Sequence, residues 1–81
     1  MVIKMAQHEI VRVLDEHMFF VNVKNASELG VGQYVEVLNT SKAYKTLSRV
    51  VEVYDKYAIC EKLGRRKVFY GDEVRFRPRY A

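Results

Sequence analysis

The chain has 81 residues, of which 49% are hydrophobic and 30% charged, and its formal net charge is +4. This length suits one domain with one core, and the apolar content is too high for a disordered chain. No apolar run approaches the about 18 residues of a membrane span, and residues 1–5 lack the apolar core of a signal peptide. The single cysteine, Cys60, excludes an internal disulfide framework and is typical of a reducing compartment. We therefore expect one small domain over residues 1–81, in the cytoplasm and without membrane contact.

Apolar and polar residues alternate with a period of two, which is typical of strands with one buried face. The pattern predicts strands over residues 9–14, 18–24, 33–39, 48–54, 57–63 and 73–77. The short polar turns that follow the first and fourth strands predict two hairpins. Residues 25–30 predict a single helical turn capped by Asn25 or Ser27. Residues 39–45 predict a loop or one short helical turn.

The two halves of the chain resemble each other, approximately as residues 9–39 and 48–77. The segment IVRVLD from residue 10 aligns with VVEVYD from residue 50, and GQYVEV from residue 32 aligns with GDEVRF from residue 71. A three-stranded half leaves two open edges and an uncovered apolar face, whereas two paired halves can close the sheet. We therefore predict an all-β fold, a small closed six-stranded barrel built from two ββ(turn/helix)β repeats with pseudo-two-fold symmetry.

The alternation also predicts which side chains fill the barrel. The expected interior residues are Val11, Val13, Phe19, Val21, Val23, Val35, Val37, Val51, Val53, Ile59, Leu63, Val74 and Phe76. A barrel of this size is filled by its own side chains. We therefore expect no small-molecule ligand.

The segment Gly71-Asp72-x-Val74-x-Phe76, with its partner Gly32-Gln33-x-Val35-x-Val37, resembles the GD box of cradle-loop barrels. This group includes the riboflavin-synthase-like and swapped-hairpin barrels. The resemblance implies two interlocking halves, with the Gly-Asp pair tying a turn to a neighbouring strand, and Gln33 replaces the acid in the first copy. It concerns the fold and leaves function open. An SH3-like or OB-like barrel is the alternative fold.

Few residues indicate catalysis or metal binding. Asp15 and His17 share one predicted turn, but Cys60, the candidate nucleophile, lies on a strand of the other half. Its parity, opposite to that of Ile59, places it on the outer face or at a sheet contact. The histidines and the cysteine follow none of the spacings of structural zinc sites, and no Gly-rich phosphate loop is present. We therefore expect no enzyme activity, no catalytic residue, no metal and no cofactor.

The positive charge is concentrated at the C-terminal end. Residues 62–81 contain seven basic and two acidic side chains, whereas the first 61 residues carry a net charge of −1. Arg75, Arg77 and Arg79 alternate along the last strand and so share one face, with no acidic partner evident near them in the sequence. Such arginines suit phosphate contacts. The alternative is a solvated edge strand that arginines protect from aggregation.

Aromatic residues are interleaved with these basic residues, as in sites that stack the bases of single-stranded nucleic acid. The candidate nucleic-acid-binding residues are Lys42, Tyr44, Lys45, Arg49, Arg65, Arg66, Lys67, Tyr70, Arg75, Arg77, Arg79 and Tyr80. The sequence thus favours a non-enzymatic module that binds RNA or single-stranded DNA through a C-terminal basic face.

The alternative function is a protein-interaction or assembly module, such as an accessory subunit or virion component. Met18 and Phe20 are expected to point outward from the second strand, and an exposed pair of this kind suggests a protein partner or a homo-oligomer. Alternatively, residues 1–8 fold back and cover the pair.

Overall fold

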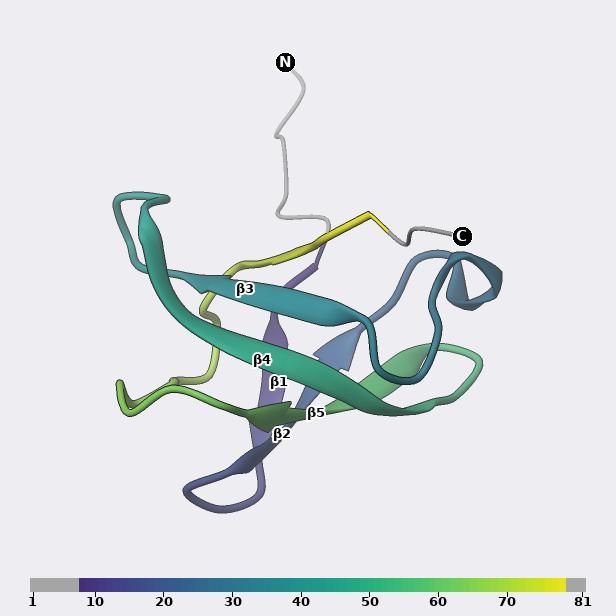
Figure 1. Ribbon diagram of the computed structural model, residues 1–81, viewed down its shortest axis with the longest axis horizontal. Helices are drawn as coiled ribbons and strands as arrows, with labels where there is room; N and C mark the ends of the chain where they lie inside the picture. Colours follow the sequence, from purple (N-terminus) through teal and green to yellow (C-terminus); the bar gives the residue numbers. More distant parts are fainter. Residues whose placement is uncertain (1–7, 79–81) are drawn as a thin grey trace.

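The computed structural model describes residues 8–78 as six antiparallel strands and one 3₁₀ turn. The elements are β1 (Ile10–Val13), β2 (Met18–Asn22), η1 (Ala26–Glu28), β3 (Tyr34–Leu38), β4 (Tyr44–Val53), β5 (Tyr57–Lys62) and β6 (Val74–Phe76). They form one sheet in the order β1-β2-β5-β4-β3-β6. The sheet is strongly curled into an open half-barrel whose concave face holds the core (Figure 1). Within the described range, no helix is long and apolar enough to cross a membrane.

The all-β class and the positions of the six strands are confirmed. The two predicted hairpins join β1 to β2 and β4 to β5. In the first hairpin, Asp15 Oδ1 accepts the amides of His17 (2.7 Å) and Met18 (2.9 Å). The predicted helical turn is η1, and the Asn25 side chain caps it by accepting the amide of Ser27 at 3.3 Å.

The strand β4 begins at Tyr44, four residues before the predicted start at residue 48. Asn39 is responsible, because its Oδ1 accepts the amides of Ser41 (2.8 Å) and Ala43 (3.1 Å). Together with a positive φ of 66° at Lys42, these bonds make a tight turn. Residues 39–43 are therefore a tight loop, the first of the two predicted alternatives, and pairing with β3 resumes at Tyr44.

The prediction of the core is partly wrong. The predicted interior residues that are buried are Phe19, Val21, Val23, Val35, Val37 and Val74. Val53 and Phe76 are half-buried and pack against the core. The predicted interior residues that remain half-buried or exposed without belonging to it are Val11, Val13, Val51, Ile59 and Leu63. Buried apolar residues that were not predicted are Ile10, Leu38, Val50, Ala58, Cys60 and Val68.

Bulges explain the errors in β1 and β4. The β1–β2 register shifts at Val11, and the β4–β5 register shifts at Val51. A bulge inserts one extra residue and so reverses the alternation between the residues before it and those after it. Ile10 and Val50, which precede the bulges, therefore face the core in place of Val11 and Val51, although Val13 and Val53 beyond the bulges also lie opposite buried residues.

In β5 the inward face is set by pairing with β2. Phe19 lies opposite Cys60 and Val21 opposite Ala58, and directly opposite residues share a face of the sheet. Cys60 is therefore fully buried on the core face, whereas the sequence placed it on the outer face or at a sheet contact and Ile59 inward. Burial raises the pKa of the Cys60 thiol to about 12, so that it is protonated at neutral pH.

Candidate functional site

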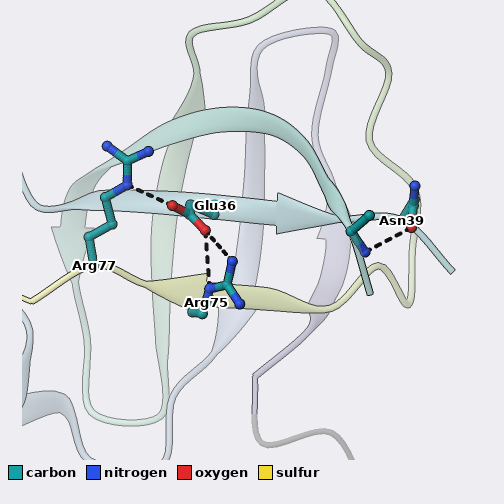
Figure 2. Close-up of polar contacts among 5 residues, drawn as sticks. Glu36, Asn39, Arg75 and Arg77 are labelled. Carbon is teal, nitrogen blue, oxygen red and sulfur yellow. Dashed lines mark hydrogen bonds and ion pairs between the residues drawn. The ribbon is translucent and has the colours of Figure 1, made fainter. Parts of the chain in front are cut away.

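The arginines of β6 have an acidic partner that the sequence analysis missed. Glu36 on β3 lies directly opposite Arg75. Arg75 Nη2 and Nε donate to Glu36 Oε1 at 2.6 and 3.1 Å, and Arg77 Nε donates to Glu36 Oε2 at 2.8 Å (Figure 2). Hydrogen bonds from Arg75 and then Arg77 lower the pKa of Glu36, so its charge offsets one of the two arginines at neutral pH. The predicted common face is confirmed for these two arginines, whereas Arg79 and Tyr80 lie outside the described residues.

Three other predicted cations are also paired with acids. Lys42 pairs with Glu73. Arg49 pairs with Glu61, with 3.0 Å between Nη2 and Oε1.

The third pair, between Lys45 and Asp72, is the most buried. Its Nζ–Oδ2 distance is 2.7 Å, and the two side chains are only 7% and 10% exposed. Lys45 Nζ also lies 4.5 Å from the centre of the Phe69 ring, a cation–π contact. Lys45 is thus a structural cation that holds the segment around residue 70 against β4, while its neighbour Tyr44 is exposed.

The connection from β5 to β6 carries the remaining cations, and we call residues 63–70 the basic loop. Arg65, Arg66 and Lys67 are exposed, and no acidic group of residues 8–78 lies within ion-pair distance of them. Phe69 and Tyr70 follow at once and are 56% and 77% exposed. The loop therefore presents three consecutive cations beside two exposed aromatic rings.

The basic loop is anchored at both ends. At its start, the amide of Leu63 donates to the carbonyl of Leu47 on β4 at 2.8 Å. Gly64 lies so close to β4 that a Cβ there would overlap Thr46 Oγ1. At its end, the amide of Phe69 donates to Asp72 Oδ2 at 2.9 Å. These contacts fix the ends of the loop, while its charged tip faces solvent.

A groove of about 600 Å³ separates the basic loop from the β1–β2 turn. Lys62, Arg65 and Lys67 line it from the loop side, and residues 15–17 line it from the turn side. Both segments lie at the lower left of Figure 1. Each segment is recognisable in the sequence by its own residues, but the groove is not, because no sequence pattern indicates that the two segments are neighbours.

The candidate interface residues Met18 and Phe20 are half-buried on the outer face of β2. The ring of Phe20 stacks on Tyr57 with centroids 5.0 Å apart, and Tyr57 stacks on Tyr54 at 4.8 Å. Part of the covering of Phe20 therefore comes from β5. The alternative covering by the N-terminal segment concerns residues that, apart from His8, lie outside the described range.

The groups considered for catalysis are held in separate environments. Hydrogen bonds from the amides of His17 and Met18 lower the pKa of Asp15, whereas Cys60 lies in the core. Among the residues that the structure describes, no three His, Cys, Asp or Glu side chains are grouped to hold a metal ion. No protein-family model, curated protein or solved structure matches the chain.

Proposed function

We propose that this protein is a non-enzymatic cytoplasmic module that binds single-stranded nucleic acid, RNA or DNA, mainly through the basic loop. The observation that carries the proposal is that Arg65, Arg66 and Lys67 are exposed and have no acidic partner within residues 8–78. A cation of this kind can contact a phosphate without first giving up an ion pair. Arginine adds bidentate geometry to such a contact.

Exposed aromatic rings beside the cations support a single-stranded ligand. Tyr70 and Phe69 present ring surface on which bases can stack, and stacking contributes about 1–3 kcal/mol per base in such sites. Phe69 was not among the predicted residues. It lies between Val68 and Tyr70, and this short apolar run did not distinguish a core role from a surface role.

The arginines of β6 are assigned a secondary part. Glu36 occupies two donors of Arg75 and one of Arg77, and a guanidinium has five N–H donors. Both arginines can therefore still donate hydrogen bonds to phosphate. Their attraction for it is weaker, because the Glu36 carboxylate offsets one of their two positive charges.

Charge reversal separates these two contributions. We expect Arg65→Glu with Lys67→Glu to weaken binding of a fluorescent single-stranded oligonucleotide more than tenfold at low salt. The matched pair, Arg75→Glu with Arg77→Glu, changes the net charge equally and should weaken binding less. Equal affinities for the wild type and the loop variant would refute the proposal.

We further propose that the curled sheet closes into the six-stranded barrel that the sequence predicted. Backbone hydrogen bonds between β1 and the segment before β6 support closure, because Ile10 N donates to Asp72 O (2.9 Å) and Gly71 N donates to Ile10 O (2.8 Å). Val74 N also donates to His8 O at 3.0 Å. Slow hydrogen exchange at the amides of Ile10 and Gly71 is expected by NMR, and fast exchange at both would mean an open sheet.

A pseudo-two-fold repeat is supported by the same pattern in the other half. Val50 N donates to Gln33 O (2.9 Å), and Gly32 N donates to Val50 O (2.8 Å). The side chains of Gln33 and Asp72 each accept the amide three residues earlier, at 3.0 and 2.9 Å. Gln33 thus makes, with its amide oxygen, the same turn contact that Asp72 makes with its carboxylate, in keeping with the resemblance to cradle-loop barrels.

The second candidate function is protein assembly, and the stack of Phe20, Tyr57 and Tyr54 on the outer sheet face favours it. Aromatic residues are enriched in protein interfaces. Light scattering should then report an oligomer that Phe20→Lys disperses, and a monomer at high concentration would count against self-assembly.

A further inference from the structure

The groove beside the basic loop has walls of opposite charge. Lys62, Arg65 and Lys67 stand on one side, and the acidic residues Asp15 and Glu16 stand on the other. Its volume of about 600 Å³ lies in the range of sites that enclose small organic ligands. A groove with only cations would suit any polyanion. A groove with one cationic and one acidic wall suits a ligand in which an anionic group is linked to a neutral group that carries hydrogen-bond donors.

Building on the proposed function, we propose that this groove holds one unpaired nucleotide of a single strand. The phosphate contacts the lysines and arginine of the loop side, and the base lies against the β1–β2 turn. Val13 and Val68 add apolar surface to the lining, which suits the face of a base. A base inside a duplex is stacked and paired, so it cannot enter the groove without being flipped out.

The acidic side of the groove also selects among bases. Asp15 directs Oδ1 to the amides of His17 and Met18. Glu16 is exposed at the tip of the turn. Ionised carboxylates accept hydrogen bonds and cannot donate them. They therefore favour bases with an exocyclic amino group, such as cytosine, over thymine or uracil, which present a carbonyl oxygen at that position.

The test compares labelled deoxycytidine and thymidine decamers and a blunt DNA duplex by fluorescence polarisation at low salt. We expect the cytidine strand to bind about five-fold more tightly than the thymidine strand, which corresponds to about one hydrogen bond. Glu16→Gln should abolish this ratio, because an amide both donates and accepts. Glu28→Gln, an exposed acid outside the groove, is the matched control and should preserve it.

A second pair of variants tests occupancy of the groove. Val13→Glu places a carboxylate in the lining at a residue that is 40% exposed, and Val31→Glu adds the same charge at a 73% exposed residue elsewhere. Only Val13→Glu should weaken binding of the cytidine strand by five-fold or more. Equal effects of the two variants would overturn the inference.

The outcomes separate the inference from the proposed function. If both single strands bind with equal affinity, or the duplex binds as tightly as the cytidine strand, the nucleotide site is wrong while nucleic-acid binding stands. If no oligonucleotide binds even at low salt, the proposed function fails and the inference fails with it.

Discussion

At the residue scale, Glu36 determines how much of the charge on β6 is available to a ligand. One carboxylate lies between two guanidiniums and is only 15% exposed, whereas the arginine side chains are 62% and 45% exposed. The Glu36 carboxylate holds Arg75 and Arg77 on one face and offsets one of their two positive charges. Exposed pairs of this kind contribute little to stability individually, so the main consequence of Glu36 is the position and net charge of the arginines.

The lowered pKa of Glu36 predicts a pH dependence of stability. Because the folded pKa lies below the unfolded value of 4.5, the stabilisation by ionised Glu36 is complete above that value. It is lost as the pH falls through the folded pKa. The difference in unfolding free energy between wild type and Glu36→Gln should therefore be constant above about pH 5 and shrink in more acidic solution. Urea titrations at a series of pH values measure it, and a difference that stays constant down to pH 2 would contradict the assignment.

At the scale of the elements, the basic loop depends on a buried anchor. Asp72 accepts hydrogen bonds from the amide of Phe69 and from the ammonium group of Lys45, and so connects the end of the loop to β4. Removing one partner of a buried pair leaves an uncompensated charge, which is far more costly than losing an exposed pair. The two neighbouring acids of this chain allow a direct comparison.

We expect Asp72→Asn to reduce the free energy of unfolding by about 3 kcal/mol. Glu73→Gln, which affects the exposed pair with Lys42, should cost less than about 1 kcal/mol. Urea denaturation of the two variants side by side gives both values. Similar losses would show that the Lys45–Asp72 pair does not act as a buried anchor.

Bulges limited what the sequence could predict about the elements. The period of two predicted every strand and both hairpins, because each regular ladder alternates its side chains between faces. It failed at Val11 and Val51, where one inserted residue reverses the alternation. A loop after β3 was predicted, but its tightness was not, since this depends on how the Asn39 side chain bonds to its own turn.

At the scale of the whole molecule, the candidate site depends on contacts between distant segments. The basic character of the C-terminal end could be predicted from composition alone. The pairing of Glu36 with the β6 arginines could not, because it requires the β3–β6 register. The groove likewise requires that the turn after β1 lie beside the loop after β5. Tertiary contacts of this kind divided the predicted basic face into paired cations and a basic loop available to ligand.

The most direct test of the basic loop is the salt dependence of binding to a labelled single-stranded oligonucleotide. Each phosphate contact contributes about −0.7 to the slope of log K against log salt concentration. Replacing Arg65, Arg66 and Lys67 by Ala should make the slope shallower by about 2. The matched control replaces Arg12, Lys24 and Lys56, three exposed cations elsewhere, and should leave the slope nearly unchanged. The same slope for both triple variants, or no binding of the wild type at low salt, would contradict the account.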